Sequence, residues 1–186
     1  MEKKDLLKDV IKHIDIKSYN STELVDAMRN MSFTSRDTAR AADILMMMCK
    51  EKECTNILTL AGSTSAAGCM QVYVDMVRNK MIDVVVATGA SIIDMDLFEA
   101  LGYKHYIGEK ENVIPDTTLR DLYIDRIYDT YIDEEELQAC DHSTYELANM
   151  LEARPYSSRE FIYEIGKWLH NGKAVKKDSL IQTCYE

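Results

Sequence analysis

The chain has 186 residues, of which 46% are hydrophobic, and this is enough apolar material to bury the core of one domain of ordinary size. Its formal net charge of −10 at pH 7 argues against nucleic acid as a partner, because phosphate binding depends on clustered lysine and arginine side chains. The same charge would suit a cationic partner, although an acidic surface also commonly serves solubility.

The five cysteines are an odd number without any CxxC pair, and this pattern argues against both a disulfide framework and a zinc site. No apolar run approaches the roughly twenty residues that cross a bilayer, and the first residues lack the apolar region of a signal peptide. We therefore expect a cytoplasmic protein that binds no membrane and holds no metal.

Residues 1–52 are predicted to form a helical lead. Apolar residues at helical spacing predict one helix over Asp5 to Ile14, and Ser21 or Thr22 is a typical cap for a second helix. A third helix should begin near Thr34 and pack on a sheet, with the methionines at positions 46–48 filling the core.

Residues 55–108 are predicted to form a βαβ unit. The apolar runs Ile57–Leu60 and Val84–Ala87 predict two parallel strands, and the second has the unbroken apolar character of a strand covered on both faces. Between them, apolar residues near helical spacing over residues 72–77 predict a crossover helix. Each strand ends in a turn of small residues, Ala61–Gly68 and Thr88–Ser91.

These two turns are the candidate binding site. In open parallel sheets, ligands sit beyond the carboxyl ends of the strands, where helix N-termini offer unpaired N–H groups and a partial positive charge. A diphosphate would suit both turns. Neither turn has the GxGxxG fingerprint, and tight packing of a helix on a strand would also explain the small residues, but two such turns in succession favour a nucleotide.

Residues 109–186 are predicted to be a mainly helical remainder. They begin with a polar connection over residues 109–117, in which Pro115 marks a turn or a helix start. The aromatic and apolar residues between Tyr123 and Tyr131 have spacings consistent with one face of a helix.

Two further helix starts can be recognised in this remainder. The acidic run that begins at Asp133 suits a first helical turn, and Ser157 is a good cap for the helix that follows it. The four histidines lie beside no serine or cysteine motif of known spacing, so hydrolase chemistry is poorly supported, and His105 is expected in a packed loop. Because no repeat or linker divides the chain, we expect a single α/β domain over residues 1–186.

Several segments resemble the deoxyhypusine synthase family, in particular its bacterial and archaeal members. They are the LAGS and AAG parts of the first turn, the DVVVATGA strand and turn, EALGYKHYIG, LRDLYIDRIYDTYID and RPYSSREFIYEIGKWL. The resemblance spans nearly the whole chain. It implies a Rossmann-like three-layer fold with a parallel sheet, in which this chain is the amino-terminal half of an NAD-binding domain.

The resemblance also implies a reaction. Spermidine is oxidised with NAD, its aminobutyl group is held as an imine on an enzyme lysine, and the group passes to a lysine of a translation factor precursor. A free amine as acceptor, ascribed to some bacterial relatives, would instead give homospermidine-type products.

The resemblance assigns residues of both turns to the NAD site. These are Gly62, Ser63, Thr64, Ser65 and Ala66 in the first turn, and Thr88, Gly89 and Ala90 in the second. An acidic residue after the second turn would accept hydrogen bonds from a ribose or a polyamine nitrogen. Both Asp94 and Asp96 match it, because relatives are typically one residue shorter at this point.

The enzymes of the family are longer, and their second half carries the imine-forming lysine and further acidic ligands. No lysine of this chain matches the catalytic one, so we expect half an enzyme that needs a complementary carboxy-terminal chain. The short lead predicts no amino-terminal plug over the active-site entrance. An exposed strand edge favours association, so an oligomer is expected. A non-catalytic paralogue that binds a nucleotide or a catalytic subunit is the alternative.

Overall fold

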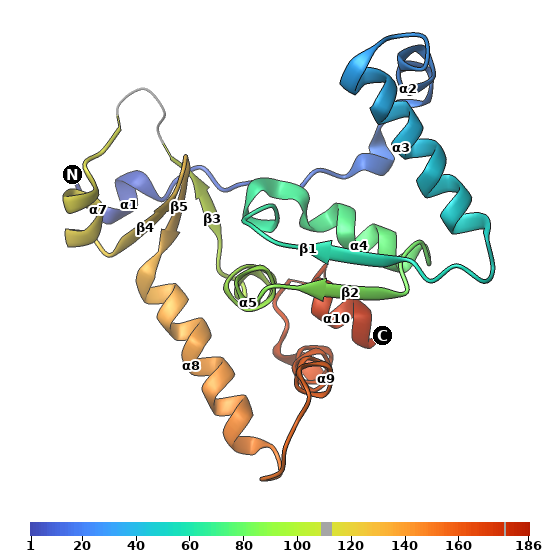
Figure 1. Cartoon of the computed structure of the whole chain (residues 1–186). Helices are drawn as coiled ribbons and strands as arrows, with labels where there is room; N and C mark the ends of the chain where they lie inside the picture. Colours follow the sequence, from blue (N-terminus) through green and yellow to red (C-terminus); the bar gives the residue numbers. More distant parts are fainter. Residues whose placement is uncertain (109–112, 177) are drawn as a thin grey trace.

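The computed structural model describes residues 1–108, 113–176 and 178–186 and has an α/β fold with two small sheets (Figure 1). The strands are β1 (Ile57–Leu60), β2 (Val84–Ala87), β3 (His105–Ile107), β4 (Ile124–Ile127) and β5 (Thr130–Asp133). The α-helices are α1 (Lys3–Leu6), α2 (Thr22–Met28), α3 (Phe33–Lys50), α4 (Met70–Arg78), α5 (Gly89–Ser91), α6 (Phe98–Ala100), α7 (Asp116–Asp121), α8 (Glu134–Met150), α9 (Ser158–Trp168) and α10 (Leu180–Tyr185). Short segments of other helical types are η1 (Ile16–Ser18), η2 (Ser65–Cys69), η3 (Ile92–Leu97) and η4 (Leu169–Lys173).

The predicted βαβ unit is confirmed. Strands β1 and β2 pair in parallel, with Ile57 opposite Val84 and Leu60 opposite Ala87, and helix α4 connects them. On one face of this sheet, β1, α4 and α10 contribute apolar side chains to a buried cluster that consists of Leu60, Met70, Val74 and Leu180. Both turns therefore follow strands that are fixed from one side.

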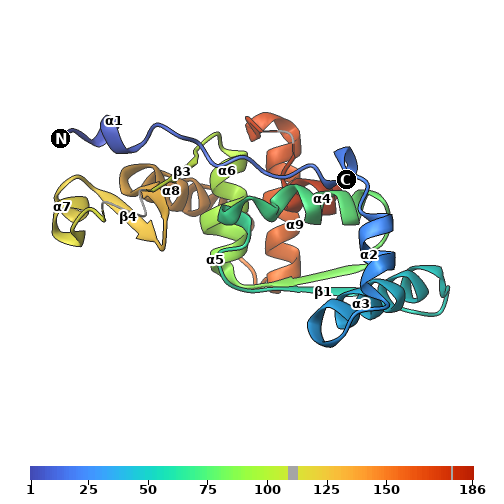
Figure 2. The ribbon, with the colours of Figure 1, turned by 90° about the horizontal axis from the view of Figure 1, so that it is seen from above.

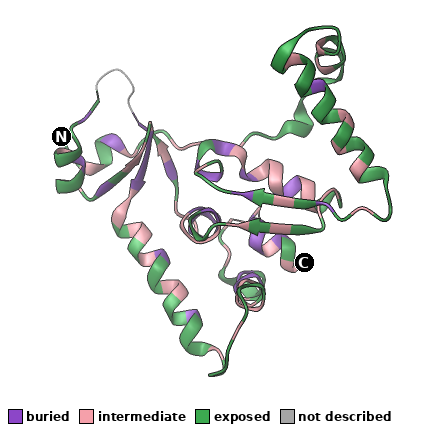
Figure 3. Ribbon diagram, viewed as in Figure 1, coloured by how far each residue is buried: buried purple, intermediate pink, exposed green. Residues whose placement is uncertain are grey.

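The opposite face of the parallel sheet is exposed. Ile57, Val84 and Val86 keep 55%, 42% and 55% of their surface accessible, and Figure 3 shows the exposed stretches of both strands. The expectation that Val84–Ala87 is covered on both faces is wrong for this chain, because the described residues do not bury the second face. An apolar sheet face of this kind is normally buried by a further layer.

Helix α3 begins where predicted but does not fill the core. It stands away from the body of the molecule and packs beside α2 (Figures 1 and 2). Met46 and Met47 are 56% and 61% exposed, whereas Ala39 is buried. The predicted core role of these methionines is therefore wrong in this chain, since the described residues leave that side of the helix uncovered.

The first predicted helix is also shorter than expected. Helix α1 ends at Leu6, and the chain then runs mostly extended over residues 8–18, a segment that we call the strap. Val10 of the strap pairs with Tyr106 of β3 in an isolated antiparallel bridge. The predicted helix over Asp5–Ile14 is wrong because this long-range pairing replaces it. Helix α2 begins at Thr22, as predicted.

The largest buried cluster surrounds the helical run formed by α5, η3 and α6. Helices α8, α9 and α10 and strand β5 pack against this run. The buried side chains are Leu97, Phe98, Ala100, Ile132, Cys140, Leu147, Ile165, Leu169 and Ile181. This packing fixes the direction of the helical run that leaves the second turn.

A three-stranded antiparallel sheet in the order β3-β5-β4 replaces the helix that was predicted between Tyr123 and Tyr131. Tyr128 has a φ of +55° and turns the chain between β4 and β5, with 92% of its surface exposed. Tyr131 is 1% exposed and packs with apolar residues of α7 and β4. The tyrosines thus point in different directions along a hairpin rather than sharing one helix face.

The other predicted helix starts are confirmed. Helix α7 begins at Asp116 directly after Pro115, although residues 109–112 of the polar connection lie outside the described residues. The Asp133 side chain accepts N–H groups at the start of α8, and Ser157 forms a capping box with Glu160 at the start of α9.

The structure also bears on the expectations about disulfides and membrane-spanning helices. All five cysteines are free thiols. Within the described ranges, the structure has no helix with the length and apolar character that crossing a membrane requires.

Candidate functional site

The first turn leaves open space in front of its backbone. Gly62 has a φ of +75°, a left-handed conformation that favours glycine, and a Cβ at this position would meet nothing within 4 Å. Ser65 is 2% exposed, and its Oγ has no hydrogen-bond partner among the described residues. Because a buried hydroxyl normally has a partner, Ser65 is a polar group that a ligand would satisfy.

The second turn leads directly into a helix. The Thr88 side chain caps α5 by accepting a hydrogen bond from the N–H of Ser91 at 3.3 Å. Gly89 is the first residue of that helix, and a Cβ there would again meet nothing within 4 Å. The helical run therefore presents its N-terminal N–H groups and partial positive charge beside open space.

The two turns are held together. The Ser91 Oγ donates a hydrogen bond to the Gly62 carbonyl at 3.1 Å, and the Thr88 N–H donates to the Leu60 carbonyl at 3.1 Å. The residues assigned to the NAD site in both turns consequently lie together at the carboxyl ends of β1 and β2. They are Gly62, Ser63, Thr64, Ser65, Ala66, Thr88, Gly89 and Ala90.

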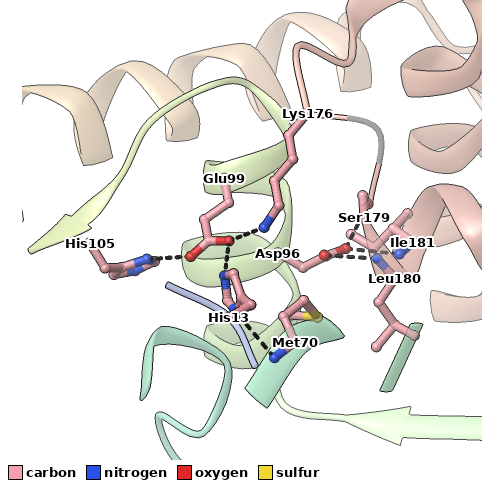
Figure 4. A network of polar contacts seen from close by, with 9 residues as sticks. All are labelled: His13, Met70, Asp96, Glu99, His105, Lys176, Ser179, Leu180 and Ile181. Carbon is pink, nitrogen blue, oxygen red and sulfur yellow. Dashed lines mark hydrogen bonds and ion pairs between the residues drawn. The ribbon is translucent and has the colours of Figure 1, made fainter. Parts of the chain in front are cut away.

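The two candidate acidic residues, Asp94 and Asp96, have different surroundings. Asp96 is 2% exposed and accepts three hydrogen bonds at 2.8 Å, from the Ser179 hydroxyl and from the N–H groups of Leu180 and Ile181, as Figure 4 shows. Asp96 thus fixes the start of α10. Asp94 makes no hydrogen bond or ion pair within the described part of the chain, and Asp141 lies near it.

The protonation of both carboxyl groups is perturbed. Burial raises the pKa of Asp94, and the nearby Asp141 carboxylate raises it further. Burial also raises the pKa of Asp96, against the opposing effect of the hydrogen bonds from Ile181, Leu180 and Ser179. Asp94 therefore keeps a proton to higher pH than an exposed aspartate does.

A second polar network lies behind the turns, around Glu99 (Figure 4). Its carboxylate is contacted by His13 Nε2 at 2.6 Å, by His105 Nδ1 at 2.9 Å and by Lys176 Nζ at 2.5 Å. Burial alone would raise the pKa of Glu99, but hydrogen bonds from His105 and His13 and the charge of Lys176 outweigh burial and hold the pKa well below its ordinary range.

The sequence did not point to this network, because His13 and Lys176 lie far along the chain from Glu99 and His105. One local signal was present: Glu99 stands between apolar residues of the main core, and it is only 8% exposed. A charged residue in such a run needs buried partners. His105, predicted in a packed loop, begins strand β3 and is 1% exposed.

Comparisons with known proteins agree on one family. The family model described as deoxyhypusine synthase matches residues 23–186. A deoxyhypusine synthase-like protein of Caulobacter vibrioides is 64% identical, with 100% of this chain and 50% of that protein covered. A deoxyhypusine synthase-like protein of Coxiella burnetii is 58% identical, with 99% of this chain and 52% of that protein covered.

A solved structure supports the fold. It is a crystal structure of an Entamoeba histolytica protein that carries the same family name, with a TM-score of 0.57 and 21% identity. The match covers 94% of this chain and 60% of that one. The chain spans about half the length of the curated relatives it matches.

Proposed function

This chain belongs to the deoxyhypusine synthase family, and we therefore propose that it forms the amino-terminal half of an NAD-dependent aminobutyl transferase. The enzyme cleaves spermidine and transfers the aminobutyl group to a lysine of a translation factor precursor. The observation that carries the proposal is the pair of adjacent glycine turns, which are hydrogen-bonded to each other and open at both Cβ positions.

The residues of the two turns fit a dinucleotide. Gly62 and Gly89 allow a diphosphate to approach the backbone closely, and the N–H groups at the start of α5 face it with a partial positive charge. The buried Ser65 hydroxyl gains a partner when the site is filled. NAD, when bound, supplies the hydride acceptor for oxidation of the carbon next to the secondary amine of spermidine.

This chain supplies binding and orientation rather than the nucleophile. Lys176 is already paired with Glu99, and no other lysine of the chain matches the family's catalytic lysine by position. We therefore assign the imine-forming lysine and the rest of the Rossmann-like three-layer fold to a complementary carboxy-terminal chain. The exposed face at Ile57, Val84 and Val86 supports this assignment, because a second half would bury it.

Asp94 is the acid that we assign to the ribose or to a polyamine nitrogen, since Asp96 is engaged by α10. In the complete enzyme, Asp94→Asn should weaken NAD or spermidine binding about tenfold, because a carboxylate hydrogen bond to a charged or hydroxyl group is lost. Asp121→Asn is the control, because Asp121 lies on α7 and pairs with Arg120. Titration calorimetry of both variants measures the effect, and unchanged affinity for both ligands in Asp94→Asn would remove Asp94 from the site.

The function is tested by reconstitution. The chain is co-expressed with the carboxy-terminal half of the Caulobacter vibrioides relative, and the purified complex is given spermidine and NAD. Transfer of the aminobutyl group leaves 1,3-diaminopropane, so its NAD-dependent release is the expected result, and neither half alone should produce it. A stable complex that releases no 1,3-diaminopropane would contradict the proposal. Supplying a protein lysine or a free amine then identifies the acceptor and separates deoxyhypusine from homospermidine-type synthesis.

A further inference from the structure

The strap, residues 8–18, contacts β3, the first turn, α4 and α6. Figure 2 shows it running across the molecule beside α6 and α4. The Ile11 N–H donates to the His105 carbonyl of β3 at 2.9 Å, and the Ile14 N–H donates to the Gly68 carbonyl in the first turn at 3.0 Å. The strap precedes residue 23, where the match to the family model begins.

At Gly68 the strap and the first turn are in contact through their backbones. Gly68 has a φ of +93°, and a Cβ at this position would lie 2.9 Å from the Lys12 carbonyl oxygen. That separation is too short for a carbon atom against a backbone oxygen. The kink between η2 and α4 therefore needs glycine both for its conformation and for the close approach of the strap.

His13 connects the helices that follow the two turns. Its Nδ1 accepts a hydrogen bond from the N–H of Met70, the first residue of α4, at 3.2 Å. This places the ring proton on Nε2, which donates to Glu99 at 2.6 Å. Glu99 lies in α6, at the end of the helical run that starts at the second turn (Figure 4). One imidazole thus links α4 to that run.

A second attachment lies further along the strap. Lys17 Nζ pairs with Asp75 of α4 at 2.7 Å, and the Asp75 side chain is 5% exposed. Burial would raise the pKa of Asp75, but the Lys17 hydrogen bond contributes to a net lowering. The strap consequently holds α4 at both its first residue and its middle.

From these contacts we propose that the strap sets the relative placement of the two turns, with His13 as a positioning residue that acts through the Met70 N–H. The effect on NAD affinity rests on the proposed function, whereas the effect on the conformation of the first turn does not. The strap touches the turn at Gly68, on a different glycine from the open Gly62, so it supports the site without filling it.

Gly68→Ala tests the backbone contact, and Gly172→Ala is its matched control. Gly172 also has a positive φ, +105°, but a Cβ there would meet nothing within 4 Å. Both variants carry the same type of backbone strain, and only the first displaces the strap. In the full chain, Gly68→Ala should speed amide hydrogen exchange over residues 65–70 by about tenfold relative to Gly172→Ala. Equal exchange in the two variants would overturn the proposal.

His13 variants test the side-chain contact. The amide oxygen of asparagine can replace Nδ1 as acceptor of the Met70 N–H, whereas glutamine reaches Glu99 instead. In the reconstituted complex, His13→Gln should weaken NAD binding about tenfold and His13→Asn less than about threefold. Equal losses, or a larger loss in His13→Asn, would contradict positioning through Met70. If the unsubstituted complex binds no NAD, the proposed function fails, but the role of the strap can still be tested. Amide hydrogen exchange over residues 65–70 should then be faster in His13→Gln than in His13→Asn, and equal exchange would overturn that role.

Discussion

Replacing Gly89 by valine is expected to weaken NAD binding by the reconstituted complex at least about 100-fold, which corresponds to about 2.7 kcal/mol. Gly89 is the first residue of α5, and its φ lies outside the left-handed range, so valine needs no unusual backbone conformation. Among the residues that the structure describes, a Cβ at Gly89 meets nothing within 4 Å. The added methyl groups would therefore meet the bound nucleotide and cover the helix N-terminus, without disturbing the fold.

Ser158→Val is the matched control for this variant. Ser158 is the first residue of α9, is exposed, and lies on a different helix from both turns, so the same side chain enters the same helical position away from the site. Titration calorimetry measures NAD affinity, and thermal unfolding monitors the fold. If Gly89→Val binds NAD as tightly as Ser158→Val does, the second turn does not hold the cofactor.

The largest effect on stability is expected at Glu99. Glu99→Gln removes the charge that Lys176 and the two histidines contact in a largely buried position, and it should lower the free energy of unfolding at pH 7 by about 3 kcal/mol. Glu135→Gln removes a carboxylate that pairs with Lys3 but is 71% exposed, so it should cost less than about 1 kcal/mol. Urea unfolding of the full chain measures both differences.

The Glu99 effect should depend on pH in a defined direction. The pKa of Glu99 is lower in the folded chain than its ordinary value of 4.5, so ionised Glu99 stabilises the fold above that value. This contribution is lost as the pH falls below about 4.5, where the unfolded chain binds the proton first. The stability difference between the wild-type chain and Glu99→Gln should therefore narrow between pH 7 and pH 3. A constant difference across this range would contradict the network.

The two small-residue turns could be predicted because their signal is local. Each strand is a short apolar run, and each run ends in small residues, so Gly62 and Gly89 were located by the chemistry of adjacent positions alone. The helix starts at Thr22, Glu134 and Ser158 were predictable for the same reason, because a cap and its helix are neighbours in sequence.

The strap and the hairpin could not be predicted from local pattern. Val10 is extended because Tyr106 is its partner, and a helical spacing of apolar residues carries no information about a strand so far along the chain. The tyrosine-rich segment fits either a helix or a hairpin by spacing. The segment forms a hairpin, and the turn of that hairpin needs a positive φ at Tyr128, which is uncommon for an aromatic residue.

Apolar pattern alone overestimates the burial of positions that only a further layer of secondary structure would cover. The apolar character of β2 and of Met46 and Met47 predicts contact on every side, but the described residues cover one face of the sheet and leave these methionines exposed. The preference for Asp94 over Asp96 is a proposal that rests on α10, whose first N–H groups bind Asp96. In both cases the burial or pairing of a side chain depends on distant elements, which the surrounding sequence does not specify.

Photolabelling locates the nucleotide without any substitution. The reconstituted complex is irradiated with an azido-adenine analogue of NAD, digested, and analysed by peptide mass spectrometry. The two-turn site predicts labelled peptides from residues 61–68 or 88–94, and excess NAD should suppress that labelling. Labelling confined to other segments of this chain, or labelling that NAD does not suppress, would contradict a cofactor wall formed by the turns at Gly62 and Gly89.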